Sequence, residues 1–298
     1  MRQITCPVCK IPPENTPVSQ SIHLCNTCGV RWTYFVEEVD SEALYKDEVY
    51  SIVDNRKSIF ERIIFFEAKK ILRKAHEIHP NANSLLDFGS GKGQFLSKAK
   101  EAGWKGLGIE TAIERATFAR EKYQVAVLND FYQGGKIQNG NFDFITLNHV
   151  LEHLPDPMML LSDLLENNLA KDGLVYLEVP RSDSWQAKIA GLNWMHWDIP
   201  KHLTHWTEEG LEKEFSKIGF KKVSSRGFSV HLGVLGMLHA LLSKAGYKEN
   251  LILRLKKNKT PSLLLLIALF FPFAMIFELI SSGFDKSGIF GIYLRKNG

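Results

Sequence analysis

Short apolar runs alternate with helix-spaced apolar patterns through the middle of the chain, from residue 84 to residue 228. The runs that predict strands are SLLDF, GLGIE, VAVL, FDFITLN, LVYLEV and KKVSSRGF. The patterns between them predict helices over residues 94–103, 113–122, 157–169 and 208–219. Such an alternation is typical of a parallel sheet with helices on both faces, so the sequence predicts an α/β fold.

Strongly apolar sequence follows the last of these strands and fills residues 229–285. Its second half has an apolar core from Leu263 to Ile280, which only Pro272 and Glu278 interrupt. The run IFGIYLR then predicts one more strand close to the C-terminus. We therefore expect an apolar helical insertion before the last strand, and an amphipathic helix over residues 59–79 ahead of the first.

Composition places the chain among ordinary globular proteins. Its 298 residues are 45% hydrophobic and 23% charged, which excludes a disordered or coiled-coil chain. The net charge of +4 is too small to argue for a nucleic-acid partner. The N-terminal sequence MRQITCPVCK has no apolar secretory stretch, so we expect a cytoplasmic protein.

All four cysteines lie within the first 28 residues, in two C-x2-C pairs. This spacing predicts a tetrahedral zinc site of four thiolates, with a structural role because no coordination position stays open. An iron–sulfur cluster or a redox dithiol is the competing interpretation. The predicted division is a zinc ribbon at 1–36, a connector at 37–58 and a main domain at 59–298. The four ligands are Cys6, Cys9, Cys25 and Cys28.

A glycine-rich turn connects the first predicted strand to a helix. Glycines there let the main chain turn tightly and let a ligand approach the backbone closely. The spacing is neither that of the dinucleotide-binding loop nor that of a P-loop. The residues of this turn that we expect to contact a ligand are Asp87, Gly89, Ser90, Gly91 and Gly93.

Polar and aromatic residues follow the next three strands. Glu110 ends the second strand, Asp130 and Phe131 follow the third, and Asn148 ends the fourth. Open parallel sheets bind ligands at the carboxyl ends of their strands, so these residues are expected to share one cleft. A carboxylate at the position of Glu110 suits a ribose diol. Asp130 and Phe131 suit an adenine amino group and an adenine ring, respectively.

The motifs DFGSGKG, GLGIE and LNDF resemble those of class I S-adenosylmethionine-dependent methyltransferases, over residues 60–298. FDFITLNHVLEHLPDP and IPKHLTHWTEEGLEKEFSKIGF are similar to the subgroup related to ubiquinone-biosynthesis methyltransferases. The resemblance implies a Rossmann-like seven-stranded sheet with an antiparallel last strand, and S-adenosylmethionine as the cofactor. It also implies that Asp87 orients the glycine loop, that the loop holds the amino-acid end of the donor, and that Asn148 faces its methyl group.

Histidines surround the position where the methyl group would lie. One interpretation is a base and acceptor pocket that uses His149, His153 or His202, because histidine titrates near neutrality. A second is a divalent metal on Glu152, His153 and His202, which resembles small-RNA 3′-end methyltransferases, although His149 replaces the first Glu of that pattern. A third is that these residues only tie a loop to the sheet. Four tryptophans interleaved with the later histidines make that loop a candidate lid.

The expected acceptor is a small or lipid-linked molecule, methylated at oxygen. An RNA or protein methyltransferase that docks through the ribbon, and a non-catalytic donor-binding protein, are the alternatives. Nucleic acid is unlikely, because the ribbon has only three cations, Arg2, Lys10 and Arg31. The insertion is either a buried or dimeric helical cap, or a peripheral membrane contact at 229–282. A single crossing conflicts with the return of the chain to the sheet, so a true span is not expected.

Overall fold

The computed structural model describes residues 3–13, 21–36, 54, 56–247, 249, 251–257 and 260–297. Most of the predicted connector at 37–58 lies outside these residues. The α-helices are α2 (Ile59–Ile78), α3 (Gln94–Glu101), α4 (Ile113–Phe118), α5 (Pro157–Asn168), α6 (Trp185–Ala190), α7 (Glu208–Lys217), α8 (Leu235–Lys244), α9 (Leu251–Lys257) and α10 (Pro261–Gly283). The short helical turns are η1 (Ala119–Tyr123), η2 (Leu151–His153), η3 (Gly191–Asn193), η4 (Met195–Trp197) and η5 (Val230–Val234).

A seven-stranded sheet forms the centre of the molecule, in the order β5-β4-β3-β6-β7-β10-β9. Only β10 runs antiparallel to its neighbours. This confirms the predicted α/β sheet and its antiparallel last strand. The strands are β3 (Ser84–Phe88), β4 (Lys105–Glu110), β5 (Ala126–Asn129), β6 (Phe142–Asn148), β7 (Leu169–Pro180), β9 (Phe220–Arg226) and β10 (Ile289–Lys296).

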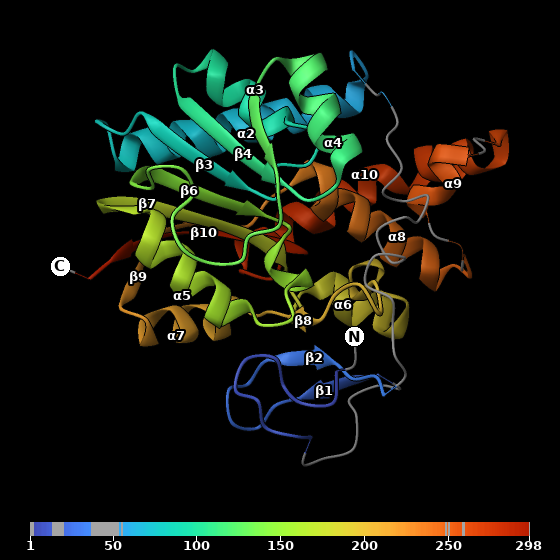
Figure 1. Ribbon diagram of the computed structural model, residues 1–298. Coiled ribbons are helices and arrows are strands. Elements are labelled where there is room, and N and C mark those ends of the chain that lie inside the picture. The colour runs from blue at the N-terminus through green and yellow to red at the C-terminus, as the bar shows by residue number, and fades with distance from the viewer. Residues whose placement is uncertain are drawn as a thin grey trace.

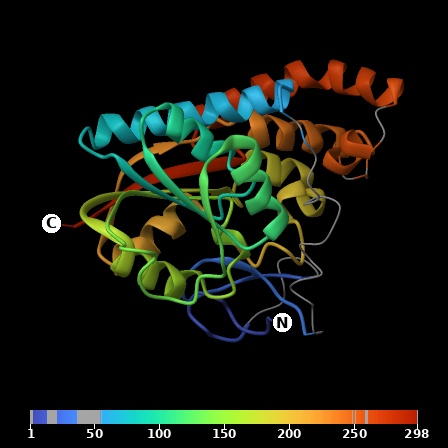
Figure 2. The same cartoon turned by 45° about the horizontal axis from the view of Figure 1, so that its top comes forward.

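Helices cover both faces of this sheet (Figures 1 and 2). Apolar residues of α2, α3 and α4 pack with Phe144, Tyr176 and Tyr293 on one face. Leucines of α5 and residues of α7 pack with Ile145 and Leu177 on the other. The chain builds β4 and β5 on one side of β3 and then crosses to β6 on its other side. Ligands bind at such a switch point, at the carboxyl ends of the strands.

The N-terminal segment forms a second, three-stranded sheet with the main domain. Its own strands are β1 (Ile22–Leu24) and β2 (Arg31–Thr33), and the third is β8 (Thr204–His205) from the predicted lid loop. Trp32 is buried in the same apolar core as α5 and α7. The predicted ribbon is therefore packed against the main domain, and sequence patterns did not indicate its pairing with β8.

The predicted apolar insertion is present as η5, α8, α9 and α10. α8 packs on α10, and η5 contacts both α2 and α10. By length and composition alone, α10 is a candidate membrane span, and only 17% of its most apolar window is buried. Its C-terminal end is fixed to the domain, because Gly288 N–H donates to the fully buried Glu278 Oε1 at 2.8 Å.

Candidate active site

The glycine loop after β3 has the backbone conformation that its sequence predicts. Gly89, Gly91 and Gly93 all have φ between 54° and 78°, a region that other residues enter at a cost. A Cβ on Gly89 would lie 2.5 Å from Val150 Cγ2, and one on Gly93 would lie 2.7 Å from the Ala119 Cβ. The loop therefore needs glycine both for its φ angles and for its close packing.

Glu110 joins the end of β4 to this loop. It is buried, and its Oε2 accepts from Gly91 N–H at 2.8 Å while its Oε1 accepts from Ala112 N–H at 2.9 Å. Asn129 at the end of β5 donates from Nδ2 to the Glu110 backbone oxygen at 2.9 Å. A hydrogen bond thus connects the glycine loop directly to Glu110, the acid that is predicted to bind the ribose.

Asp130 and Phe131 follow β5 at the same edge of the sheet. Asp130 Oδ1 accepts from Phe131 N–H at 2.8 Å, which fixes the turn. The Phe131 side chain is 68% exposed, although it is large and apolar. An aromatic ring exposed to solvent is suited to stacking on a planar base.

Asp87 lies beneath the loop and is buried. Burial raises its pKa to about 7, and the hydrogen bond that Thr146 Oγ1 donates to Asp87 Oδ1 at 2.7 Å acts in the opposite direction. Among the described residues, Ser90 Oγ and Asn148 Nδ2 are buried without a hydrogen-bond partner. Unpaired buried polar atoms are costly, so a polar ligand in this cleft is expected to satisfy them. The predicted donor residues therefore fit a polar cofactor.

His149 follows β6 with a φ of 55°, which is unusual for a residue with a side chain. Its Nδ1 lies 3.6 Å from Glu152 Oε1, and its Nε2 lies 3.3 Å from Glu178 Oε1. Burial alone would lower its pKa, but the two carboxylates raise it to about 10. His149 is therefore an imidazolium at neutral pH, held between two acids.

Glu178 belongs to an ion-pair chain that the sequence analysis missed. Arg226 Nη1 lies 3.0 Å from Glu178 Oε2, and Arg226 Nη2 lies 3.6 Å from Glu67 on α2. Glu178 and Arg226 stand on strands that both pair with β10, and both are in register with Gly291. Because Gly291 has no side chain, the Tyr176 ring occupies the space above it, and the Tyr176 hydroxyl donates to Glu178 Oε2. A glycine inside the run IFGIYLR was the signal available in the sequence.

Glu152, His153 and His202 form a compact cluster next to His149. One ligand-type atom from each lies within 4.8 Å of the others. His153 Nδ1 contacts the Lys201 oxygen at 3.0 Å, and His202 Nδ1 contacts the His196 oxygen at 2.8 Å. A carbonyl oxygen only accepts, so each Nδ1 carries the proton and each Nε2 carries the lone pair.

The charge states of this cluster follow from burial. Burial and the neighbouring His202 lower the pKa of His153 to about 4, and burial also lowers the pKa of His202. Burial would raise the pKa of Glu152, but the neighbouring His149 imidazolium outweighs burial and lowers it to about 2. Two neutral imidazoles therefore lie beside one ionised carboxylate. Within the described part of the chain, neither Glu152 carboxylate oxygen has a hydrogen-bond partner.

The ribbon supports the loop that carries His202. Thr33 Oγ1 donates to the His202 backbone oxygen at 2.6 Å and lies 2.9 Å from His205 Nε2. Thr33 N–H donates to the Leu203 oxygen at 3.0 Å. The same loop contacts η5 through His196 Nε2, which lies 3.3 Å from the Leu232 oxygen. The histidine cluster thus lies between the ribbon and the apolar insertion.

The tryptophans of this loop are mostly packing residues. Trp194 and Trp206 are buried, and their ring nitrogens donate to Gln186 Oε1 at 3.0 Å and to Thr204 Oγ1 at 2.9 Å. Trp197 packs edge-on against Trp194, with ring centroids 4.9 Å apart. Opening and closing of the loop stays a prediction.

The four cysteine sulfurs converge as their spacing predicts. One sulfur from each lies within 4.8 Å of the others, with Cys6 and Cys28 3.6 Å apart and Cys9 and Cys25 3.2 Å apart. Zinc–sulfur bonds of about 2.3 Å imply sulfur separations of about 3.8 Å in a tetrahedron. Lys10 and Gly29, each just after a C-x2-C pair, have positive φ and turn the chain. The geometry fits a four-thiolate zinc ion.

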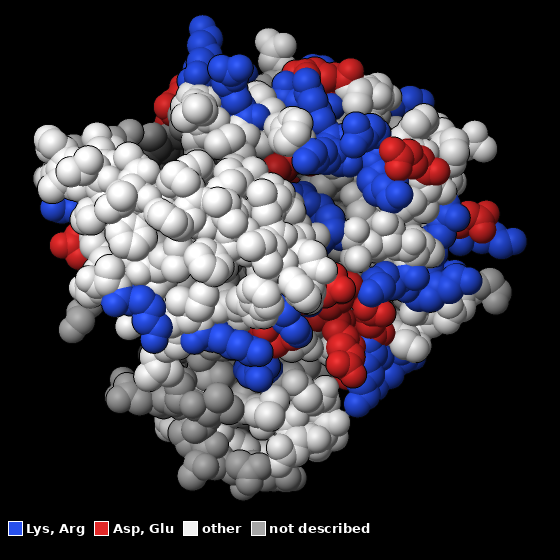
Figure 3. All heavy atoms as spheres, turned by 180° about the vertical axis from the view of Figure 1, so that it is seen from behind, with Lys and Arg blue, Asp and Glu red and all other residues white. Residues whose placement is uncertain are grey.

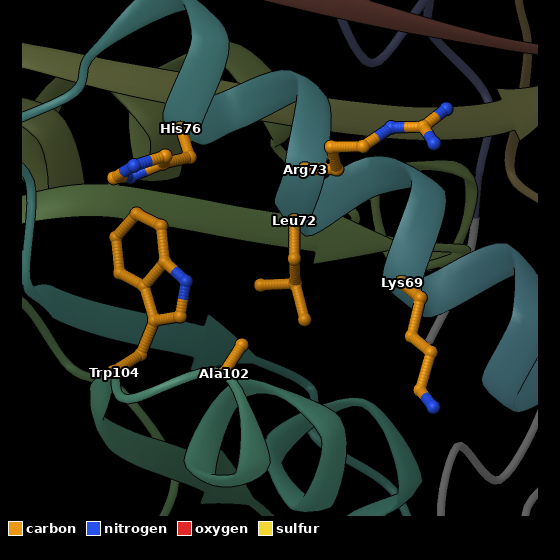
Figure 4. Close-up of a pocket in the computed structure, with 6 residues that line it drawn as sticks. All are labelled: Lys69, Leu72, Arg73, His76, Ala102 and Trp104. Carbon is orange, nitrogen blue, oxygen red and sulfur yellow. The ribbon is translucent and has the colours of Figure 1, made fainter.

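A cavity of about 240 Å³ lies between α2 and the end of α3, where His76 stands near Trp104 (Figure 4). Trp104 immediately precedes β4, so this cavity is at the amino-terminal edge of the sheet. The donor loop is at the opposite edge. The cavity does not belong to the site described above.

Comparisons with known proteins agree with this fold. The sequence profile of a family described as "Methyltransferase domain" matches residues 60–225. The structure resembles a SAM-dependent methyltransferase from Archaeoglobus fulgidus, with a TM-score of 0.50 and 16% identity over 86% of this chain and 100% of that one. It also resembles the plantazolicin methyltransferase BpumL in complex with SAH, with a TM-score of 0.52 and 15% identity over 86% and 93%. No curated protein matches the sequence.

The matched profile and the fold define a class I S-adenosylmethionine-dependent methyltransferase domain. Since the matched profile covers more than half of the chain, the protein belongs to this methyltransferase-domain family. The two structural neighbours are distant in sequence, so they support the fold alone.

Proposed function

We propose that the protein transfers the methyl group of S-adenosylmethionine to an oxygen atom of a small or lipid-linked acceptor. The observation that supports this most is the Glu152, His153 and His202 cluster, which follows β6 beside the donor loop. Bound S-adenosylmethionine supplies an electrophilic methyl group, and an oxygen nucleophile must lose its proton to attack it. A neutral imidazole in a water-poor pocket can accept that proton.

The residues divide into two groups by task. Glu110 holds the ribose, the Gly89–Gly93 loop holds the amino-acid end, and Asp130 with Phe131 holds the adenine, as the resemblance implies. Asp87 orients the loop and Asn148 faces the methyl group.

On the acceptor side, His153 or His202 accepts the proton, and Glu152 stabilises the imidazolium that results. His149 was an equal candidate for the base from the sequence. Its raised pKa favours a positioning role, because a cation cannot accept a proton.

A divalent cation on the same three residues is the second candidate. Both Glu152 carboxylate oxygens lack hydrogen-bond partners among the described residues, and neutral imidazoles with fixed Nδ1–H groups are good ligands. Titration with Mn²⁺ would distinguish the two, since Mn²⁺ prefers oxygen and nitrogen ligands over thiolates. A heat of Mn²⁺ binding that the wild type shows and Glu152→Gln lacks supports a metal site. Identical titration curves for the wild type and Glu152→Gln would exclude it.

The four cysteines are proposed to hold a structural zinc ion rather than to bind an acceptor. Of the described ribbon cations, Lys10 forms an ion pair with Asp156 at 2.6 Å, and Arg31 donates to Ser182 Oγ at 3.4 Å. Cations that already have partners on the main domain are poorly placed to grip phosphates. This supports a small or lipid-linked acceptor over RNA.

Transfer of labelled methyl into whole-cell extract, separated into lipid, small-molecule, RNA and protein fractions, tests the proposal. Label in the lipid or small-molecule fraction supports it, and label in RNA or protein replaces it with the docking alternative. His153→Ala and His202→Ala should lose turnover while S-adenosylmethionine affinity stays within about twofold. The exposed His76→Gln is the matched control. Binding of S-adenosylmethionine with no label in any fraction would indicate a non-catalytic protein.

A further inference from the structure

α10 exposes an apolar surface far larger than a water-soluble helix normally shows. Eleven large apolar side chains on or just after α10 are 40–72% exposed, and Glu278 is the only charged residue of the helix. They are Leu264, Leu265, Leu266, Leu269, Phe271, Phe273, Ile276, Phe277, Leu279, Ile280 and Phe284. We call this set the α10 face.

The α10 face is continuous and uncharged when the molecule is seen from behind. A broad area there lacks Lys, Arg, Asp and Glu, and charged side chains, many of them Lys and Arg, lie along its borders (Figure 3). The neighbouring α2 exposes four cations at Lys69, Lys70, Arg73 and Lys74. The surface is therefore apolar at its centre and basic at its edge.

α10 lies along the domain and cannot leave it. Glu278 Oε2 accepts from Gln186 Nε2 at 3.1 Å, in addition to the bond from Gly288 N–H to Oε1. Five residues after α10 the chain enters β10, which pairs on both sides inside the sheet. The C-terminal end of α10 is fixed, and the strand that follows it lies inside the sheet. The helix can therefore contact a partner along its side but cannot insert end-on.

We propose that the α10 face docks the protein onto the surface of an anionic lipid bilayer, with the helix in the plane of the interface. Apolar side chains enter the acyl boundary, and the basic border meets lipid phosphates. A second copy of the chain fits less well, because a twofold interface would bring the same basic border against itself. Anionic lipid of the cytoplasmic leaflet offers the complementary charge.

Docking would bring a lipid-borne acceptor close to the histidine cluster. η5 contacts α10 on one side and His196 on the other, and His231 packs edge-on against Phe60 with ring centroids 4.7 Å apart. This delivery of a lipid-borne acceptor rests on the proposed methyl transfer. The docking itself does not.

Sedimentation of the full chain with vesicles tests the docking without donor or acceptor. The protein should bind phosphatidylcholine vesicles that contain phosphatidylglycerol, and bind pure phosphatidylcholine vesicles more weakly. The triple variant L265Q/L269Q/F273Q should lower the partition coefficient at least tenfold. Substitution of apolar residues exposed on other faces, L24Q/M159Q/V223Q, is the control and should leave binding unchanged.

Three results would overturn the proposal. The first is no binding of the wild type to anionic vesicles, and the second is equal binding by the α10 triple variant. The third is a dimer in lipid-free ultracentrifugation that the α10 triple variant converts to monomer, without vesicle binding. Hydrogen exchange of the wild type should also slow in residues 261–283 on vesicles, which keeps the test open if the variant misfolds. Calorimetric titration with S-adenosylmethionine separately reports the donor site, so failure of docking and failure of methyl transfer are distinguishable.

Discussion

The main-chain N–H of Gly91 donates to Glu110 Oε2 at 2.8 Å, so the glycine loop and the acid of the next strand form one unit. Glu110 also accepts from Ala112 N–H. A single carboxylate therefore fixes both the loop after β3 and the turn after β4. The donor cleft is already organised around this residue.

Glu110→Ala should weaken S-adenosylmethionine binding by roughly 10–100-fold. A hydrogen bond to a carboxylate contributes about 1.5–3 kcal/mol, so this range corresponds to the net loss of one such bond. Glu110→Gln should have a smaller effect, because it keeps one acceptor oxygen. Isothermal titration calorimetry measures both. Glu114→Ala, an exposed acid in α4, is the control, and an equal loss there would contradict the specific role of Glu110.

Loss of one of the cysteines proposed to bind zinc should lower turnover and leave the affinity for S-adenosylmethionine unchanged. Cys28→Ser should lower the bound zinc and the melting temperature by roughly 5–10 °C, since about 1 kcal/mol corresponds to about 2–4 °C in chains of this size. Turnover should fall because Thr33 no longer supports His202. Metal analysis, calorimetry and methyl transfer check this. Asn26→Ala, between Cys25 and Cys28, is the control. If Cys28→Ser also loses affinity for S-adenosylmethionine, the cysteine site and the donor site are coupled, contrary to this prediction.

His149 should make the stability of the protein depend on pH between 7 and 10. Its folded pKa of about 10 is above its ordinary value of 6.5, so the stabilisation is complete below pH 6.5 and is lost as the pH rises through 10. His149→Gln removes the positive charge beside the buried Glu152 and leaves Glu178 with Arg226 as its remaining charged partner, which should cost about 3–5 kcal/mol at pH 7.

Urea unfolding at pH 7.0 and 9.5 measures this dependence. The wild type should lose more stability than His149→Gln between the two values, and His76→Gln should follow the wild type. The two acids have lowered pKa values of about 2, so their own contribution is lost only below about pH 4.5. If the free energy of unfolding changes equally with pH in the wild type and in His149→Gln, the histidine is neutral in the folded protein.

Gly288→Ala should destabilise the protein by about 1–3 kcal/mol through overpacking. A Cβ at this position would lie 1.6 Å from Gln186 Nε2 and would displace the hydrogen bond between Gln186 and Glu278. Gly283→Ala is a matched control, since a Cβ there has no described atom within 4 Å. Thermal unfolding compares the two, and similar melting temperatures would mean that Gln186 moves aside freely.

The sequence predicted the strands well, because they depend on local patterns, and the predicted donor residues rest on local motifs in the same way. SLLDF and FDFITLN match β3 and β6 residue for residue. The predicted helix at 113–122 is interrupted, since α4 ends at Phe118 and a π-turn follows. The prediction of the donor cleft depended only on the glycine loop and the acids that follow the neighbouring strands.

The remaining parts of the site arise from contacts between distant segments. β8 has two residues, which is too short for any periodicity to show, and its partner β2 is about 170 positions away. The pairing of Glu178 with Arg226 depends on β10 lying between their strands, an order that no local pattern contains. Charge state was also out of reach, since the difference between His149 and His153 comes from the number of carboxylates around each ring.

The short β8 strand also bears on how the molecule assembles. The donor cleft uses residues 87–148, which are close in sequence, whereas the β2 and β8 contact closes a loop of about 170 residues. Long loops close late, because their entropy must be overcome before the contact forms. The β2–β8 contact, which orders the loop that carries His202, is therefore expected to form later in folding than the local contacts within residues 87–148.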